Sequence, residues 1–183
     1  MVRTAADLLS TGGVAGTTVD RVLAVSGAPR GSVYHHFPDG RSQLLVEAVG
    51  YAGAYVERSI REAPRASDAL DSFVAFWRAR LESTDFRAGC PLLAATIDDG
   101  PGGPDAREMQ LVAADYLGRW EVALAGRLED AGLDTASARE RAEQSLSLLE
   151  GAVAMSRARR DIGPLDSAAS AIGVLFRAAA TRD

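Results

Sequence analysis

Residues 17–37 constrain the fold more than any other stretch, because one short helical pattern is followed there by a glycine turn and then by a second helical pattern. Residues 17–20 (TTVD) fit the Ser/Thr-x-x-Asp/Glu motif that starts many helices. In this motif the hydroxyl of the cap residue accepts a free backbone N–H of the first turn, and the acid three residues later accepts the backbone N–H of the cap residue. We therefore expect a helix to begin near Thr18. Gly27 can end that helix, because glycine readily adopts a positive φ. The inward face of the helix would hold Val19, Val22, Leu23 and Ser26.

The second pattern follows Pro29, which fixes φ and lacks an N–H, and so suits a corner or a first helical turn. Val33 and Phe37 are four residues apart and would share a buried face. Gly31 and His35 would lie nearly opposite that face. The sequence thus predicts two helices joined by a tight turn, the second with a small, polar and aromatic outward face.

These outward groups suit the base edges and the backbone of a DNA duplex. Arg30 stands at the first turn, from where its side chain can swing past the helix end. An arginine fork can bind guanine O6 and N7, a serine can bind any base, and a hydroxyl or a helix N-terminus can hold a phosphate. The sequence therefore predicts a DNA-reading helix, and a helix-turn-helix that no longer binds DNA is the alternative.

Many positions of the first 45 residues agree in order and spacing with one known family: Ala5, Ala6, Leu8, Leu9, Gly13, residues 17–19, Gly27, residues 31–38, Leu44 and Leu45. Through them the N-terminal part of the chain resembles the TetR/AcrR family of transcriptional regulators. The resemblance implies a three-helix DNA-binding head and a larger helical body. A finer likeness to the LmrA/YxaF-type branch rests on Leu23 and on residues 27–32, 38–41 and 89–92.

The resemblance also implies roles for single residues of the head. Arg30, Ser32 and His35 match positions that reach base edges in the major groove, and Gly31 lies among them. Most family members have a lysine where this chain has Gly40, so we expect the phosphate contact there to pass to Arg41. Positions that touch the DNA backbone in the family are matched by Thr17, Thr18, Tyr34 and His36. No metal or cofactor is expected, because a histidine pair without further spaced ligands is more often structural.

Charge is the feature that fits DNA binding least. The chain of 183 residues has a net charge of −5, but residues 1–45 hold four arginines and three acids, which gives +1 there and −6 for the rest. Binding should therefore rely on a dimer that doubles the contacts, and its salt dependence should be modest. A helical adaptor that binds only protein would explain the low positive charge, but it leaves residues 31–37 without a role.

Beyond Phe37 the apolar spacing is helical almost throughout, and no alternating strand pattern competes with it. We predict an all-α fold of about nine helices, in which residues 1–45 form the helix-turn-helix DNA-binding domain and residues 46–183 the effector-binding and dimerisation domain. A loop is expected at residues 100–104 (GPGGP). The later helices are expected over about residues 41–63, from 67 onward, and over 91–98, 104–131, 135–159 and 164–181.

The last two predicted helices are rich in alanine, glycine and serine, which let helices approach closely. The resemblance implies that they form a four-helix interface with a second copy of the chain. Packing within one chain alone is the alternative. In a homodimer, two reading helices about 34–36 Å apart would match the two halves of a palindromic operator.

The resemblance further implies a small-molecule pocket in the body. A hydrophobic or planar aromatic effector would bind there, change the separation of the two heads and release the DNA, which would relieve repression. The candidate lining residues form an apolar and aromatic set with few polar anchors: Phe73, Trp77, Cys90, Met109, Tyr116, Trp120, Leu149 and Met155.

Two alternative hypotheses concern the polar residues outside the reading helix and the lone cysteine. The thiol of Cys90, expected at a helix N-terminus, could sense oxidants, although a lone cysteine is usually a small buried hydrophobe. An enzyme is not expected, because Asp98-Asp99, His35-His36 and Cys90 lie on separate segments without a nucleophile elbow, a phosphate loop or metal-ligand spacing.

The single cysteine excludes an internal disulfide, and the sequence shows no secretory segment and no apolar run near the length of a membrane span. A soluble cytoplasmic protein without membrane contact is therefore expected. The first helix should begin at Met1 or Val2. The basic residues that often precede it in the family are then missing, either by truncation or because the protein lacks that arm.

Overall fold

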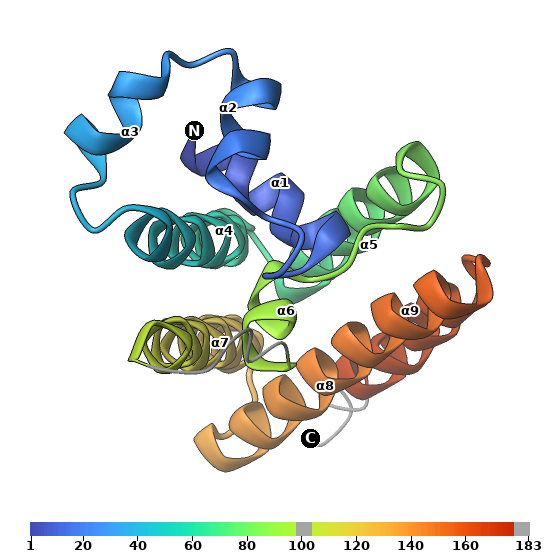
Figure 1. Cartoon of the computed structure of the whole chain (residues 1–183). Helices are drawn as coiled ribbons and strands as arrows, with labels where there is room; N and C mark the ends of the chain where they lie inside the picture. Colours follow the sequence, from blue (N-terminus) through green and yellow to red (C-terminus); the bar gives the residue numbers. More distant parts are fainter. Residues whose placement is uncertain (98–103, 178–183) are drawn as a thin grey trace. The chain divides into compact units, whose positions relative to one another are not determined.

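The computed structural model of the chain describes residues 1–97 and 104–177, and every regular element in these residues is an α-helix (Figure 1). The all-α expectation is confirmed, with nine helices in the described part of the chain. None of the helices described there is long and apolar enough to cross a membrane. In chain order they are α1 (Val2–Gly12), α2 (Val19–Ser26), α3 (Arg30–His36), α4 (Arg41–Glu62), α5 (Ala66–Ser83), α6 (Pro91–Ile97), α7 (Pro104–Asp130), α8 (Thr135–Arg159) and α9 (Gly163–Arg177).

Several helix ends lie at residues whose chemistry favours an end. Gly27 and Gly132, with φ of 70° and 99°, follow α2 and α7. Asp134 caps α8, because its carboxylate accepts the backbone N–H groups of Ala136 at 3.1 Å and Ser137 at 3.0 Å. The hydrogen bonds from Ser137 lower the pKa of Asp134 below its ordinary value. Most of the loop predicted at residues 100–104, and the end predicted near residue 181, lie outside the described residues.

Contacts between residues divide the chain into two compact units. The first unit comprises Met1–Tyr55 and Gly89–Leu117, and the second comprises Val56–Ala88 and Gly118–Asp183. Helices α4 and α7 supply residues to both units. In the first unit, α1 packs against α2 and α6, and the Gly89 N–H donates to the carbonyl of Ser10 at 2.8 Å. The fully buried side chains of this unit include Leu9, Val14, Val22, Val33, Leu44, Leu45 and Leu92.

A glycine lets α4 and α7 approach closely within the first unit. A Cβ atom on Gly53 would lie 2.3 Å from Cγ of Tyr116, which is closer than two carbon atoms can approach. A Cβ atom on Gly50, one turn earlier, would lie at an ordinary 3.7 Å from the same ring. The ring of Tyr116 therefore packs directly on the α4 backbone at Gly53.

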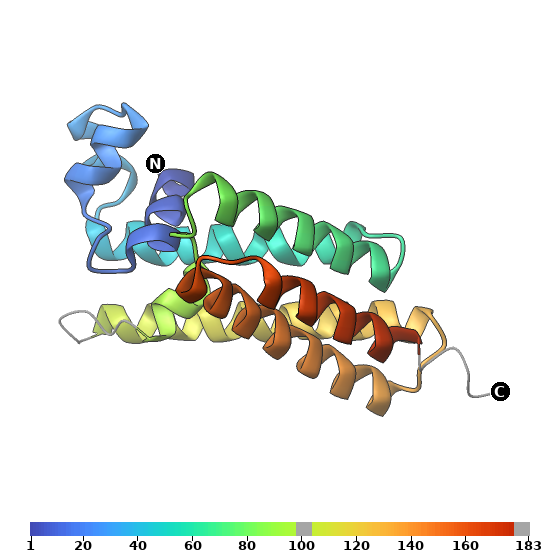
Figure 2. The same cartoon turned by 90° about the vertical axis from the view of Figure 1, so that its right-hand side faces the viewer.

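In the second unit, α8 and α9 lie side by side (Figure 1, Figure 2), and α5 packs against both of them. Small buried residues such as Ala138, Ala142 and Ala168 line these helices and allow the close approach. The largest fully buried side chains of this unit are Trp120, Leu81, Leu128, Leu165 and Ile172.

A buried carboxylate links α4 to α7 within the second unit. Glu57 is only 7% exposed, and it pairs with Arg61 at 3.0 Å and with Arg119 at 2.8 Å. Burial by itself would raise the pKa of Glu57. The hydrogen bonds from Arg61 and Arg119 outweigh that effect and hold the pKa of Glu57 below its usual 4.5.

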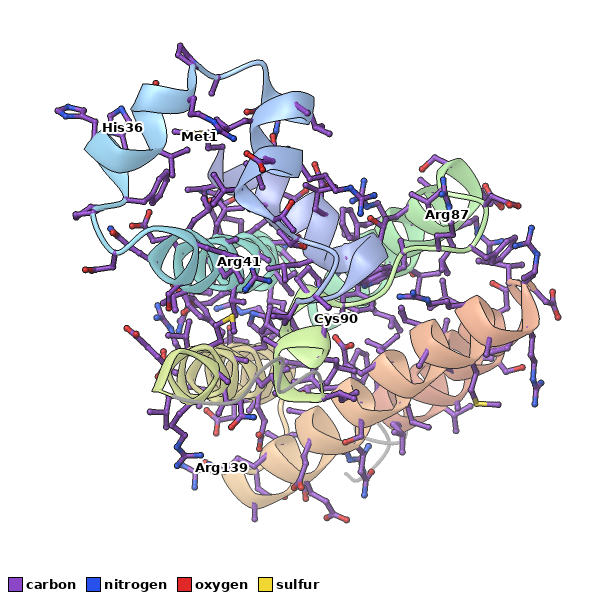
Figure 3. The ribbon with its side chains drawn as sticks, in the orientation of Figure 1. Met1, His36, Arg41, Arg87, Cys90 and Arg139 are labelled. Carbon is purple, nitrogen blue, oxygen red and sulfur yellow. The ribbon has the colours of Figure 1, made fainter. Side chains whose placement is uncertain are left out.

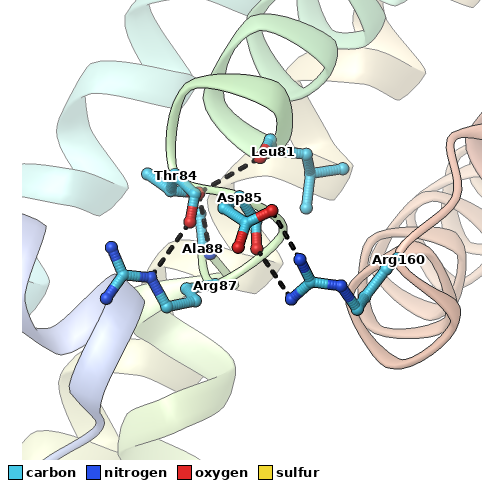
Figure 4. A network of polar contacts seen from close by, with 6 residues as sticks. All are labelled: Leu81, Thr84, Asp85, Arg87, Ala88 and Arg160. Atoms are coloured by element: carbon cyan, nitrogen blue, oxygen red, sulfur yellow. Dashed lines mark hydrogen bonds and ion pairs between the residues drawn. The ribbon is translucent and has the colours of Figure 1, made fainter.

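A polar network joins the α5–α6 connection to the α8–α9 connection, again within the second unit (Figure 4). Asp85 and Phe86 have φ of 53° and 56°, in the left-handed region that residues other than glycine rarely adopt. The Thr84 hydroxyl accepts the backbone N–H of Ala88 at 3.1 Å. Arg160, with φ of 54°, pairs with the Asp85 carboxylate, and its hydrogen bond lowers the pKa of Asp85.

Candidate functional site

The predicted helix-turn-helix is present as α2, the turn at residues 27–29 and α3. Pro29 precedes α3 with φ of −63°, and its carbonyl accepts the backbone N–H of Ser32 at 2.9 Å. Val22, Val33 and Phe37 are 0%, 1% and 4% exposed. These three are buried apolar side chains of α2, of α3 and of the residue that follows α3, as their spacing predicted.

The start of α2 differs by one residue from the capping pattern expected at residues 17–20. The helix begins at Val19, so Thr18 is the cap, and its hydroxyl accepts the backbone N–H of Arg21 at 3.2 Å. Thr17 is buried, and its hydroxyl donates to the carbonyl of Gly13 at 2.8 Å. Asp20 then lies at the second helical position, too early to bind back to the cap, and the expected capping contact of this acid was wrong.

The face of α3 opposite Val33 is exposed to solvent. Gly31 and His35 are exposed, and a Cβ atom on Gly31 would meet no other atom within 4 Å. His36 projects outward from α3 (Figure 3), and its ring meets that of His35 edge to face at 5.0 Å between centroids. Among the described residues no three His, Cys, Asp or Glu side chains are grouped to hold a metal. The side chain of Tyr34 lies outside the described residues.

Three arginines in or next to the motif already have polar partners within the first unit. Arg21 donates to the carbonyl of Gly16 at 3.1 Å. Arg41 donates through Nε to the carbonyl of Thr17 at 2.8 Å and through Nη2 to that of Val14, which fastens the start of α4 to the α1–α2 connection. No local sequence pattern indicates this bracing role for Arg41. The third arginine, Arg30 at the first turn of α3, pairs with the carboxylate of Asp20.

The residues expected to line an effector pocket are divided between the two units. Cys90, Met109 and Tyr116 belong to the first unit. Trp77, Trp120, Leu149 and Met155 belong with Phe73 to the second, where the ring centroids of Phe73 and Trp77 are 6.2 Å apart. Trp120 is buried at 1% exposure, whereas Met155 is 46% exposed.

The second unit contains an apolar cavity of about 20 Å³. Of the predicted set, Phe73 and Leu149 line it. Ser145 also lines it, is 0% exposed, and is a buried hydroxyl for which the structure gives no hydrogen-bond partner. The sequence interpretation missed Ser145, although it lies four residues before Leu149 on the same helical face. The full lining is Ile60, Ala69, Leu70, Phe73, Leu124, Ser145, Leu146, Leu149, Ile172 and Phe176.

Cys90 directly precedes α6 and is 6% exposed. A thiol that is largely withdrawn from solvent has little access to dissolved oxidants. The burial of Cys90 favours the role of a small buried hydrophobe over that of a redox sensor.

Two segments of the chain match known families of transcriptional regulators. Residues 2–48 match bacterial regulatory proteins of the tetR family, and residues 66–171 match the C-terminal domain of LmrA/YxaF-like transcriptional regulators. The crystal structure of the regulatory protein TetR from Rhodobacter sphaeroides shares the fold, with a TM-score of 0.78 and 20% identity over 95% of each chain.

Two curated relatives are similar over nearly the whole chain. The HTH-type transcriptional regulator Rv0196 of Mycobacterium tuberculosis strain H37Rv is 44% identical over 168 residues, which are 91% of this chain and 87% of the relative. The HTH-type transcriptional regulator YxaF of Bacillus subtilis strain 168 is 29% identical over 183 residues, with 97% of this chain and 93% of the relative covered.

Proposed function

Because the chain belongs to the TetR family of bacterial transcriptional regulators, we propose that it is a homodimeric repressor that leaves a palindromic operator when a small hydrophobic or aromatic effector binds. Proteins of this family are DNA-binding regulators and not enzymes. In the proposal, residues 1–45 read DNA, residues 46–183 bind the effector and dimerise, and the protein acts in the cytoplasm, where bacterial DNA is located.

The division of α3 into two faces is the observation that best supports DNA reading. Val33 is buried, whereas Gly31 and His35 are exposed and the side chain of Arg30 is 72% exposed at the N-terminal end of the helix. A helix with one bare polar face can enter the major groove, which is about 12 Å wide. The proposed contacts to DNA come from Thr18, Arg30, Gly31, Ser32, Tyr34, His35 and His36. Thr17 and Arg41 complete the set expected from the sequence, but Thr17 is buried and the Arg41 guanidinium is bonded to backbone carbonyl groups, so we propose that these two support the motif instead.

Selection of genomic fragments by the full-length protein, followed by footprinting of the preferred fragment, tests this role. We expect a protected palindrome. Arg30→Ala should weaken binding to that fragment by about 1–3 kcal/mol, because it removes a bidentate contact to guanine. Arg58→Ala, which removes an exposed arginine from α4 in the second unit, serves as the control and should leave binding unchanged. Equal loss in both variants would remove Arg30 from the base-reading set.

The proposal of a dimer is supported by apolar side chains of α8 and α9 that are exposed to solvent in the single chain. Leu148 on α8 is 41% exposed and Val174 on α9 is 57% exposed. An open groove runs between the two helices, with Ser147, Leu148, Ala171 and Leu175 among its lining residues. Helices that expose apolar residues on a shared surface bury them when a second copy packs on top.

The apolar cavity of the second unit supports the effector. Its lining residues are apolar except for Ser145, whose unpartnered hydroxyl could bind one polar atom of a ligand. At about 20 Å³ the cavity has room for a single water molecule, so an effector must widen it. Binding would thus favour a different arrangement of the helices, which is what a switch requires.

A screen for compounds that both raise the melting temperature and release the DNA tests the effector. The expected hits are hydrophobic or planar aromatic molecules with one polar atom. Their affinity should fall in Ser145→Ala, and it should be unaffected in Ser72→Ala, which removes an exposed hydroxyl from α5 in the same unit. A broad library in which no compound does both would remove the support for a ligand switch.

A further inference from the structure

The pair formed by Arg30 and Asp20 links the two helices of the DNA-binding motif across the turn. Nη2 of Arg30, the first residue of α3, contacts Oδ1 of Asp20 in the first turn of α2. The two side chains are 72% and 75% exposed. The bond is therefore open to solvent and to any partner that approaches the outward face of α3.

Arg30 is the arginine of the motif best placed to act on DNA. The guanidinium groups of Arg21 and Arg41 are bonded to backbone carbonyl groups at the α1–α2 connection. The partner of Arg30, in contrast, is a carboxylate that also cancels its charge. Asp20 is one of only three acids in residues 1–45, against four arginines. One residue therefore halves the net positive charge available there, from +2 to +1.

We propose that Asp20 is a specificity-determining residue that acts through Arg30, so that the arginine binds a guanine edge well and a phosphate poorly. The inference rests on the proposed DNA-binding function. A guanidinium has five N–H donors. While one N–H of Nη2 stays with Asp20, others are left for O6 and N7 of guanine.

A phosphate presents a different case, because it is an anion like Asp20. To bind Arg30 it must either displace the carboxylate or lie close to it, and two like charges repel each other. Non-specific binding, which consists almost entirely of phosphate contacts, therefore loses most of the contribution of Arg30. Asp20 lowers the affinity for all DNA and lowers it more for DNA without the correct base.

The experiment compares two labelled duplexes of equal length by fluorescence anisotropy at several KCl concentrations. One duplex is the fragment that the full-length wild-type protein selects from genomic DNA, and the other is a shuffled version of it. Asp20→Asn is compared with Asp20→Glu, which keeps the charge, and with Asp7→Asn, which removes one acid from α1. Asp20→Asn is also tested in the Arg30→Ala background. Thermal melting establishes that each variant is folded.

We expect Asp20→Asn to bind the shuffled duplex several times more tightly and to lose at least about threefold in its preference for the selected duplex, in keeping with the worth of an exposed ion pair. Its salt slope on shuffled DNA should steepen by about one phosphate contact, that is by about 0.9. Asp20→Glu should restore the preference, and Asp7→Asn should leave it intact. In the Arg30→Ala background the substitution should have no effect on preference.

An unchanged preference in Asp20→Asn would overturn the inference. An effect of the same size in Asp7→Asn or in the Arg30→Ala background would do so too, since bulk charge would then explain it. Wild-type protein that selects no fragment would instead overturn the proposed function, and the role of Asp20 with it.

Discussion

A methyl group at position 53 has no room, because the ring of Tyr116 occupies the space next to the α4 backbone. Gly53→Ala should therefore lower the free energy of unfolding by about 1–3 kcal/mol, as the new carbon forces α4 and the ring apart. Helix propensity acts in the opposite direction by about 0.5–1 kcal/mol and does not compensate. Urea denaturation followed by circular dichroism measures the difference.

Gly118→Ala is the matched control for that substitution. Gly118 lies in α7, two residues after Tyr116, and a Cβ atom there would meet nothing within 4 Å. Without a clash only propensity changes, so this variant should be more stable than the wild type by up to about 1 kcal/mol. If both glycine variants gain stability alike, the Tyr116 ring can move aside at little cost.

The sequence predicted the conformation and burial of single residues correctly where these depend on neighbours within a few residues. The burial of Val33 and Phe37 and the left-handed turn at Gly27 follow from spacing and from glycine chemistry within a few residues. The pairing of Asp20 with Arg30 was not predicted, because a one-residue shift of the helix start decides whether the acid can reach the cap. Arg41 likewise binds carbonyl groups 24 and 27 residues earlier, which no local pattern indicates.

At the scale of helices, Glu57 holds α4 to α7 through two arginines, and this link depends on pH. The folded-state pKa of Glu57 is below 4.5, so the carboxylate stabilises the fold above that value and loses its effect as the pH falls through the folded-state pKa. Glu57→Gln should therefore be less stable than the wild type at neutral pH. The difference should shrink steadily as the pH is lowered below about 4.5.

Chemical denaturation at a series of pH values measures this difference. The control is Glu62→Gln, which removes an exposed acid from the last position of α4 and should show a much smaller change. A gap between Glu57→Gln and the wild type that is constant from pH 7 to strongly acidic conditions would mean that the charge of Glu57 is not the source of its effect.

Helix limits were predictable because proline, glycine and capping acids act on their own neighbours. The expected bounds of α8, residues 135–159, agree with those observed, and Asp134 provides the cap. Which helices meet was harder to predict. Apolar spacing shows that Phe73, Leu149 and Met155 lie on helices, but it does not identify the neighbour of each face. As a result the structure places Phe73 and Leu149 at one cavity and leaves Met155 exposed.

For the whole molecule, the proposed dimer is what makes DNA binding by an acidic chain feasible. Each subunit has a net charge of −5, and residues 1–45 contribute only +1. A single motif would therefore bind weakly, whereas two linked motifs act together through their high effective concentration. Loss of the dimer should thus appear as loss of DNA binding, even though no DNA-contacting residue has changed.

Leu148→Glu tests this dependence, because it places a charge on the α8–α9 surface. We expect a folded monomer by sedimentation, and binding to the selected fragment weakened by at least about 100-fold. Leu111→Glu alters a leucine of α7 that is 54% exposed, compared with 41% for Leu148, and should leave both properties unchanged. A Leu148→Glu protein that still sediments as a dimer would exclude this surface as the interface.

The turn at Asp85 and Phe86 also affects how the chain folds during its synthesis on the ribosome. Left-handed geometry costs about 1–2 kcal/mol for each residue that has a Cβ atom, and here two such residues are adjacent. The side chain that pairs with Asp85, Arg160, is translated 75 residues after it. During synthesis the nascent turn therefore lacks this partner until the end of α8 emerges, so the second unit can reach its final form only late in translation.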